Sequence, residues 1–160
     1  MPEISVIIPN YNGAGYLKGC LDSILGLDYP SKNLEVILVD NHSQDNSIEF
    51  VSRHYPNVTI VRNEKNLGYA GGCHSGAEAS SGKKLIFLNN DCLVHKDWVR
   101  ELLEVAESNQ KTGTVSSVLY DYSSTLIDFM GNEVNFYGHA RQINFHEPVH
   151  TIPDSEYPQQ

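Results

Sequence analysis

A short apolar run that ends abruptly in three polar residues constrains the fold of this chain more than any other stretch. Residues Leu85–Leu88 show no polar alternation, a pattern typical of a strand buried on both faces of a parallel sheet. Asn89, Asn90 and Asp91 follow at once. Because open parallel sheets bind ligands beyond the carboxyl ends of their strands, the pattern places these side chains at a binding edge. The alternative is a turn or a helix cap, the commoner meaning of a polar strand end taken alone.

Three further apolar runs come before this one, and helical patterns separate them. The runs cover Ile4–Ile8, Glu35–Asp40 and Val58–Val61. Strands that alternate with helices predict an α/β domain with a mostly parallel sheet and helices on both faces. Asp40 ends its run and Asp91 follows the last one, so parallel strands would bring the two carboxylates to the same edge of the sheet.

The segments between and after these runs contain the remaining predicted elements. Apolar residues recur at helical spacing after the first run, which predicts a helix with one buried stripe. A second amphipathic helix is expected over Trp98–Ala106, with Asp97 in its first turn, and a strand over Thr114–Leu119. Asp45 is interpreted as a first-turn acid favoured by a helix dipole. The predicted stripe of the first helix consists of Leu17, Cys20, Leu21, Ile24 and Leu25.

Composition limits the classes of protein to which this chain can belong. With 160 residues, 40% hydrophobic and 19% charged, it should form a globular core. The formal net charge of −9 argues against nonspecific nucleic-acid binding, which needs a basic face. Three widely spaced cysteines give neither a zinc motif nor a disulfide framework, so we expect a reducing compartment. No apolar run approaches a membrane span, which predicts a cytoplasmic protein; peripheral membrane association and a membrane segment beyond Gln160 stay open.

Several residues near the predicted sheet edge have both a chemical and a structural interpretation. Asp91 offers a hard carboxylate oxygen of the kind that Mg²⁺ and Mn²⁺ prefer. Gly71 and Gly72, near the start of a helix, would leave backbone N–H groups open to an anion, although tight helix packing explains them as well. Tyr11 is either a turn aromatic or a platform for a nucleobase, with equal weight. Together these residues predict an anionic, metal-assisted ligand such as a nucleotide, but no particular reaction.

Four segments resemble, in order, the successive motifs of family 2 glycosyltransferases. They are Ser5–Asn12, Val39–Asp45, Arg62–Gly72 and Phe87–Asp91, within roughly the first two-thirds of the chain. Each segment is short, but their order makes the set specific. The resemblance implies a GT-A fold, which is a Rossmann-like, mostly parallel sheet with helices on both faces. It also implies binding of a nucleotide-diphosphate sugar, inversion of the anomeric centre and a role in polysaccharide biosynthesis.

The resemblance implies a role for each matching residue on the nucleotide side of the donor. Pro9 and Tyr11 would line the base pocket, Asp40 would accept a hydrogen bond from the base or the ribose, and Asn66 would border the nucleotide with the glycine pair. The donor would be a UDP- or dTDP-sugar, and the acceptor a saccharide or a lipid-linked molecule. The residues implied in donor-nucleotide binding are Pro9, Tyr11, Asn12, Asp40, Asn66, Gly71, Gly72, Asn89 and Asn90.

The polar residues after the last predicted strand correspond to the D-x-D motif of the family. Asn89 stands where the first Asp would be and could still contact the ribose as a neutral amide. Asp91 matches the second Asp, the ligand of the Mn²⁺ or Mg²⁺ that bridges the diphosphate. The Asn-for-Asp change removes one negative charge, which weakens the case for tight metal binding. A similar Asn-rich form is found in the rhamnosyltransferase-like branch of the family.

The general base that would activate the acceptor is not found in this sequence. We therefore expect residues 1–120 to form the nucleotide-sugar-binding core, and residues 121–160 a partial acceptor-side segment with a loosely ordered tail. The chain would be the donor part of a longer enzyme, truncated at the acceptor side, and pairing between copies could cover an exposed apolar face. A noncatalytic binding module of the same fold, and a phosphoacceptor domain using Asp40, are the alternatives. The isolated acids without the family's sequence context are Asp121, Asp128, Glu133, Asp154 and Glu156.

Overall fold

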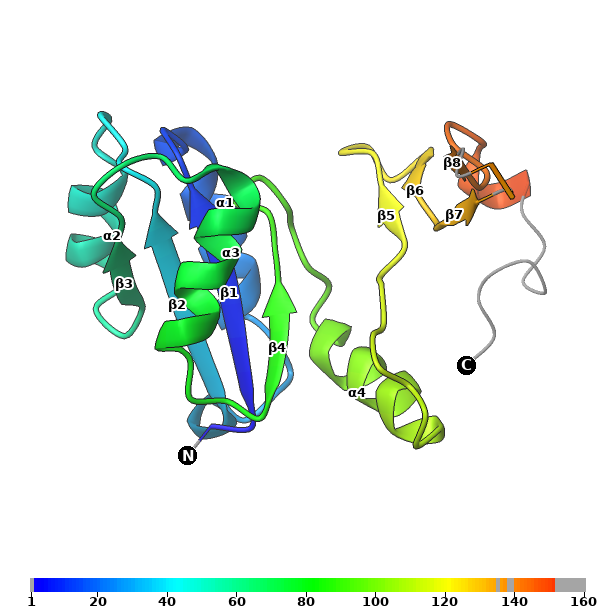
Figure 1. The fold of residues 1–160 in the computed structure, drawn as a ribbon, viewed down its shortest axis with the longest axis horizontal. Helices are drawn as coiled ribbons and strands as arrows, with labels where there is room; N and C mark the ends of the chain where they lie inside the picture. Colours follow the sequence, from blue (N-terminus) through cyan, green and yellow to red (C-terminus); the bar gives the residue numbers. More distant parts are fainter. Residues whose placement is uncertain (1, 135, 138–139, 152–160) are drawn as a thin grey trace. The chain divides into compact units, whose positions relative to one another are not determined.

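The computed structural model describes residues 2–134, 136–137 and 140–151. It divides into two compact units, Met1–Val99 and Arg100–Gln160 (Figure 1). The first unit contains the four strands of the predicted parallel sheet. The predicted division at residue 120, between a nucleotide-sugar-binding core and an acceptor-side segment, stays a prediction.

The first unit is built on a four-stranded sheet with the order β3-β2-β1-β4. All three neighbouring pairs are parallel, and Ile7 of the first strand lies opposite Ile37 of the second and Phe87 of the fourth. The α/β class with a parallel sheet, predicted from the sequence, is confirmed. The strands are β1 (Ile4–Asn10), β2 (Leu34–Asp40), β3 (Thr59–Arg62) and β4 (Lys84–Phe87).

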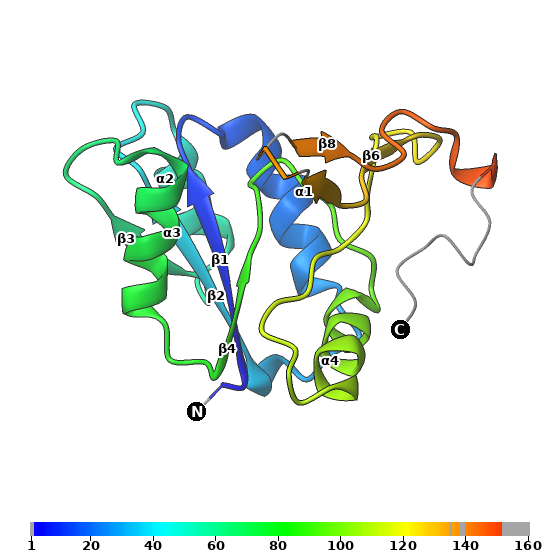
Figure 2. The same ribbon diagram turned by 45° about the vertical axis from the view of Figure 1, so that its right-hand side comes forward.

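Helices cover both faces of this sheet (Figures 1 and 2). They are α1 (Ala14–Leu25), α2 (Ser47–His54) and α3 (Gly68–Ala79), and a 3₁₀ turn, η1 (Ser31–Asn33), precedes β2. Helices α1 and α2 contact each other on one face, and α3 packs over β1 and β2 on the other. Right-handed crossovers explain this arrangement. The chain moves outward from β1 to β3 and then returns past β1 to β4, so the returning helix lies on the opposite face.

Small residues let α3 lie close to the sheet. Ile7, Ile37 and Val39 form a buried cluster, and Ala77 of α3 packs against it. A Cβ atom at Gly76 would overlap with the Ile7 side chain and would lie 2.9 Å from Val39 Cγ2. A larger residue at this position would therefore push α3 away from the sheet.

The predicted stripe of α1 is confirmed except at its last residue. Leu17, Cys20, Leu21 and Ile24 are buried, whereas Leu25 is 59% exposed. Each residue along a helix turns by about 100°, so Leu25 faces away from the side that Ile24 covers. Burial raises the pKa of the Cys20 thiol to about 12.

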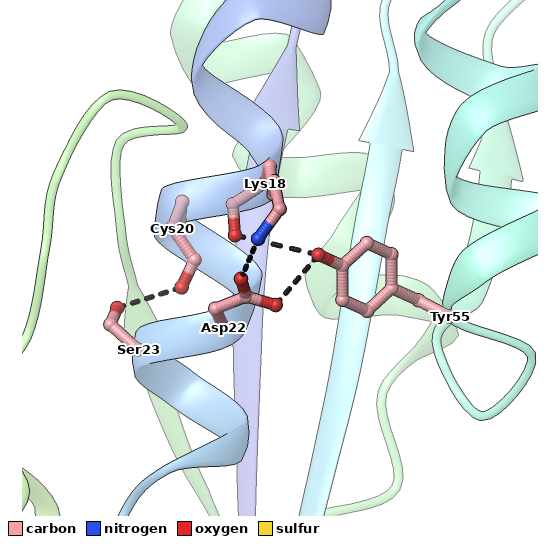
Figure 3. A network of polar contacts seen from close by, with 5 residues as sticks. All are labelled: Lys18, Cys20, Asp22, Ser23 and Tyr55. Carbon is pink, nitrogen blue, oxygen red and sulfur yellow. Dashed lines mark hydrogen bonds and ion pairs between the residues drawn. The ribbon is translucent and has the colours of Figure 1, made fainter.

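A polar network joins α1 to the end of α2 (Figure 3). The Tyr55 hydroxyl donates to Asp22 Oδ1 at 2.8 Å. Asp22 also pairs with Lys18, one turn earlier in α1. Partial burial, together with the bond to Asp22, raises the pKa of Tyr55 to about 12. The network links α1 to the carboxyl end of α2.

Strand β4 is less buried than its sequence predicts. Leu85 and Phe87 are 40% and 46% exposed, so the expectation of burial on both faces is wrong. Phe87 pairs with Ile7, whose side chain faces α3, but α3 lies chiefly over β1 and β2. A continuous apolar run thus identifies a strand without showing which of its faces a helix will cover.

The second unit contains most of a helix and two small antiparallel ladders. Strand β5 pairs with β6, and β7 pairs with β8. Among the described residues of both units, no helix has the length and the apolar character needed to cross a bilayer. The elements are α4 (Trp98–Ser108), β5 (Leu119–Tyr120), β6 (Ile127–Phe129), β7 (Asn132–Val134), β8 (Ala140–Gln142) and the 3₁₀ turn η2 (Val149–Thr151).

The structure bears on two predictions for this unit, the strand over Thr114–Leu119 and the loosely ordered tail. The strand expected over Thr114–Leu119 is wrong except at its last residue. Thr114–Val118 has no fully buried position and no ladder partner among the described residues, so nothing favours an extended pairing there. Within the tail expected to be loosely ordered, Val149–Thr151 forms a 3₁₀ turn. The remainder, residues 152–160, lies outside the described residues.

Candidate functional site

The carboxyl ends of β1, β2 and β4 meet at one edge of the sheet. Asn10, the last residue of β1, pairs in register with Asp40, the last residue of β2. The polar turn Asn89–Asp91 follows β4 after Leu88. The topology therefore brings Asp40 and Asp91 to the same edge, as expected. A cavity of about 260 Å³ lies at this edge, lined by Pro9, Asn10, Tyr11, Asn41, Asn66, Gly68, Tyr69 and Asn90.

Part of the predicted nucleotide-binding set lines this cavity. Pro9, Tyr11, Asn66 and Asn90 do so, from segments far apart in the sequence. Tyr11 is 50% exposed, so a large part of its side chain is accessible to a ligand. The predicted residues that are not among those lining the cavity are Asn12, Asp40, Gly71, Gly72 and Asn89, together with the predicted metal ligand Asp91.

Four lining residues were not singled out from the sequence. Asn10 and Asn41 end or directly follow apolar strands, the same signal that identified Asp40. Gly68 begins α3 with a φ of +72°, a backbone conformation that favours glycine. Tyr69 carries no local signal, because it lines the cavity only through the position of α3.

Asn41 is one of the residues that line the cavity, and its hydrogen bonds hold the surrounding loops. It is buried, and its Nδ2 donates to the Gly68 carbonyl at 2.8 Å. Its Oδ1 accepts from Asn63 Nδ2 at 2.8 Å and from the Leu67 N–H at 3.3 Å. These bonds tie the loop after β2 to the start of α3, so Asn41 is a structural residue of the site.

Asp40 is buried at the end of β2, and one of its carboxylate oxygens accepts a hydrogen bond from the loop that follows. Its Oδ1 accepts from the Ser43 N–H at 3.0 Å, and its backbone carbonyl accepts from the Asn63 N–H at 2.9 Å. The predicted contact of Asp40 with a base or a ribose stays a prediction.

The glycine pair of α3 is explained by packing. A Cβ atom at Gly71 would overlap with the Leu67 side chain, and one at Gly72 would lie 3.0 Å from both Asn41 Nδ2 and Pro9 Cβ. Gly72 therefore lets α3 approach two residues that line the cavity. The predicted contact of this pair with an anion has no observation in its favour.

Hydrogen bonds join the loops after β1 and β2, and one of them reaches the first residue of α1. Asn12, with a φ of 53°, accepts from the Gln44 N–H at 2.7 Å, and its own N–H donates to Ser43 Oγ at 3.0 Å. Asp45 accepts from the Ala14 N–H at 3.0 Å, at the first residue of α1. Partial burial tends to raise the pKa of Asp45, but hydrogen bonds from Ser47 and Ala14 outweigh it and lower the pKa. Asp45 thus serves α1 as well as the helix that follows it.

The turn after β4 offers one carboxylate to a cation. Its backbone closes between the Cys92 N–H and the Asn89 carbonyl at 3.2 Å, and Asp91 is exposed. Within the described residues, no group of three or more His, Cys, Asp or Glu side chains could hold a metal ion. Mg²⁺ commonly binds one or two carboxylates and completes its shell with substrate phosphates and water. The donor set therefore fits a cation that arrives with a diphosphate, held by Asp91, and not a cation enclosed by protein ligands.

Comparison with known proteins places the chain in a family. Residues 5–155 match the family model described as Glycosyl transferase family 2. The chain belongs to this family. It is 34% identical over 139 residues to the glycosyltransferase AglE of Haloferax volcanii. The matched region covers 85% of this chain and 40% of AglE. The predicted family is confirmed, whereas the rhamnosyltransferase-like branch stays a prediction.

Two solved structures are similar to this fold. A mannosyltransferase of Pyrobaculum calidifontis, in complex with GDP-Man and Mn²⁺, matches with a TM-score of 0.65 and 26% identity over 75% of this chain and 36% of its own. S. aureus TarS 1-349, in complex with UDP, matches with a TM-score of 0.62 and 21% identity over 76% of this chain and 40% of its own. The predicted GT-A-like fold is confirmed. The chain spans less than half the length of each of these relatives.

Proposed function

We propose that this chain binds the nucleotide-diphosphate sugar of an inverting glycosyltransferase and supplies the donor side of its active site. The observation that carries the proposal is the cavity at the carboxyl edge of the sheet, with Tyr11 at its rim and Asn90, next to Asp91, in its lining. The GDP-Man and Mn²⁺ of the Pyrobaculum complex, and the UDP of the TarS complex, support a ligand of this class.

The chemistry of the lining suggests how the donor lies. The lining residues are uncharged, so the cavity suits the neutral base and ribose better than a diphosphate. The base stacks on the half-exposed ring of Tyr11. Asn66 uses its Oδ1 to accept from the Gly68 N–H at 2.8 Å, which leaves its Nδ2 as a donor to the nucleotide. The diphosphate extends toward Asp91, which would hold Mg²⁺ or Mn²⁺; when bound, the cation stabilises the charge that develops on the leaving diphosphate.

Inversion requires a general base on the opposite side of the sugar from the leaving group. Asp121 is a poor candidate, because it accepts hydrogen bonds from the Ser123 side chain and from the Thr125 and Leu126 N–H groups. These bonds lower its pKa to about 2. Within the same proposal, the donor is a UDP- or dTDP-sugar of the rhamnosyltransferase-like type, used in the cytoplasm on a saccharide or lipid-linked acceptor.

Calorimetric titration of UDP, dTDP and GDP, each with Mn²⁺ and with EDTA, tests the proposal. We expect at least one nucleotide to bind more tightly with Mn²⁺, and Asp91→Ala to weaken that binding about tenfold or more, because it removes the carboxylate that holds the cation. Glu49→Ala, which removes an exposed carboxylate from α2, is the matched control and should leave binding unchanged. A folded chain that binds none of the three nucleotides, with or without Mn²⁺, would contradict the proposal.

A noncatalytic binding module is the second candidate, and Asn89 in place of a carboxylate favours it. Such a module would bind the nucleotide as described. The natural gene product would then neither hydrolyse UDP- or dTDP-sugars nor transfer the sugar, whereas an enzyme would release the free nucleoside diphosphate.

A further inference from the structure

A hydrogen bond between two amide side chains connects the central strand to the turn that carries Asp91. Asn90 donates from Nδ2 to Asn10 Oδ1 at 2.7 Å. Asn10 is 1% exposed, so protein contacts and not solvent determine the orientation of its amide. Its own Nδ2 donates to Ser43 Oγ at 3.2 Å. Through Asn10, the turn after β4 is therefore linked to the loop after β2.

The absence of a side chain at Gly13 makes room for this bond. A Cβ atom at Gly13 would overlap with both Asn90 Nδ2 and Asn10 Oδ1, the two atoms that share the hydrogen bond. The backbone itself does not require glycine, because its φ is −103°, which any residue can adopt. The contact with the amide pair therefore accounts for glycine at this position, and the backbone conformation does not.

We propose that Asn10 and Gly13 are positioning residues of the donor site, which hold Asn90, and with it the turn containing Asp91, ready for the diphosphate and its cation. This inference rests on the proposed function. Asn90 is the middle residue of the turn, and its side chain is the only one of the three for which the structure gives a bond to another strand end. With that side chain fixed, little ordering of Asp91 remains to be done when the cation binds.

The expected effect is larger with the cation than without it. Asn90 adjoins Asp91 in the chain, so the bond acts on the cation through the backbone of the turn. Direct hydrogen-bond partners of metal ligands change metal affinity about 10- to 100-fold, which sets the upper range of the expected effect. Asn10 and Asn90 line the same cavity as Tyr11 and Asn66, so loss of their bond also affects the base and ribose. If the bond positions the turn that contains Asp91, its loss should weaken nucleotide binding more in Mn²⁺ than in EDTA. Substitution of a residue that only stabilises the fold would change the affinity in Mn²⁺ and the affinity in EDTA by the same factor.

The test compares two variants that break the bond with two that keep it. Gly13→Ala inserts the overlapping Cβ atom, and Asn10→Leu removes the acceptor. Asn10→Asp retains an acceptor oxygen for Asn90. Gly15→Ala, in the first turn of α1, is the matched control, because a Cβ atom there would meet nothing within 4 Å. Each chain is titrated with UDP and GDP in Mn²⁺ and in EDTA, and hydrogen exchange of the Asn90 side-chain amide is followed by NMR.

We expect Gly13→Ala and Asn10→Leu to bind the nucleotide about tenfold or more weakly in Mn²⁺, to lose a clearly smaller factor of affinity in EDTA, and to lose protection of the Asn90 amide. Asn10→Asp and Gly15→Ala should retain both the protection and the Mn²⁺-dependent affinity. If Gly13→Ala loses its cooperative melt, the comparison of Asn10→Leu with Asn10→Asp decides.

Two negative results have different meanings. A wild-type chain that binds neither nucleotide overturns the proposed function, and the positioning role falls with it. A wild-type chain that binds in a Mn²⁺-dependent manner, while bond-breaking variants bind equally well, overturns the positioning role alone.

Discussion

The two ends of the parallel sheet are held together by different chemistry. At the amino end, the Glu35 carboxylate has bonds on both oxygens: Oε2 accepts from the Ser81 N–H at 2.9 Å and from the Ser5 hydroxyl, and Oε1 accepts from Ser81 Oγ at 2.9 Å. Ser5 Oγ in turn accepts from the Gly82 N–H at 2.9 Å. At the carboxyl end, neutral amides of Asn10, Asn41 and Asn90 make the connections.

The difference separates stability from binding. A charged group with bonds to both oxygens is costly to disturb and has little capacity left for a ligand. Asn10 and Asn41 bond through both ends of their amides, whereas Asn90 donates from Nδ2 and keeps its Oδ1 as an acceptor for a ligand. These three residues are among those that line the cavity. We therefore expect changes at the amino end to alter the free energy of unfolding and changes at the carboxyl end to alter nucleotide affinity. The following substitutions test this division, from the largest expected effect to the smallest.

Gly82→Ala should produce the largest loss of stability. A Cβ atom there would lie 2.6 Å from the Ser5 backbone nitrogen and 2.7 Å from the Ile4 carbonyl carbon, and backbone atoms of a central strand cannot move aside easily. We expect the free energy of unfolding to fall by about 3 kcal/mol in urea titrations. Gly113→Ala, where a Cβ atom would meet nothing within 4 Å, is the control. If the folded variant also lost nucleotide binding, the two ends would be coupled and the division would be wrong.

Glu35 should make the free energy of unfolding depend on pH. Partial burial tends to raise its pKa, but hydrogen bonds from Ser5 and Ser81 outweigh burial and hold the pKa below its ordinary value of 4.5. A carboxyl group with a lowered folded pKa contributes stability above the unfolded pKa and loses it as the pH falls through the folded pKa. Stability should therefore decrease below about pH 4.5.

The variant Glu35→Gln isolates this effect. We expect it to cost about 1 kcal/mol at pH 7, because the charge-assisted bonds are lost, and to flatten the decrease in stability at acid pH. Chemical denaturation between pH 3 and pH 7 measures both, with Glu64→Gln as an exposed control. An acid profile identical to that of the wild type would show that Glu35 does not stabilise this end of the sheet.

His42→Gly should have the smallest effect and the opposite sign. His42 has a φ of 69°, a left-handed conformation that is unfavourable for residues with a side chain, at the carboxyl end of the sheet. We expect a gain of about 0.5 kcal/mol in unfolding free energy, since the freed strain is partly offset by the entropy of glycine. His146→Gly, at a φ of 61° in the second unit, is the matched control. If nucleotide affinity falls only in His42→Gly, the strained loop serves binding.

The strands and helices could be predicted from the sequence more reliably than the burial of their side chains. The strands and the stripe of Leu17 to Ile24 follow from local periodicity, which each segment contains within itself. The parallel pairing follows from the alternation of strands with helices. The exposure of Phe87 follows from neither, because it depends on where α3 lies after the chain has crossed the sheet. Thr114–Leu119 failed for a similar reason: apolar residues favour a strand only if another segment pairs with them.

The site shows the same limit at the level of side chains. Pro9, Tyr11 and Asn66 were found through short motifs that resemble those of a family. The bond between Asn10 and Asn90 joins residues that are 80 positions apart, and no spacing in the sequence indicates it. Gly13 acquires its meaning only from that bond, because glycine before a helix is ordinarily interpreted as a turn residue.

The burial of Cys20 has a practical consequence for work with this protein. Its thiol is inaccessible, with a pKa of about 12, so it should remain unmodified when alkylating reagents are applied to the native chain. Cys92 directly follows Asp91 and is partly accessible. Replacing Cys73 by serine would leave Cys92 as the reactive attachment point for a fluorophore or a spin label, next to the place where a cation would bind.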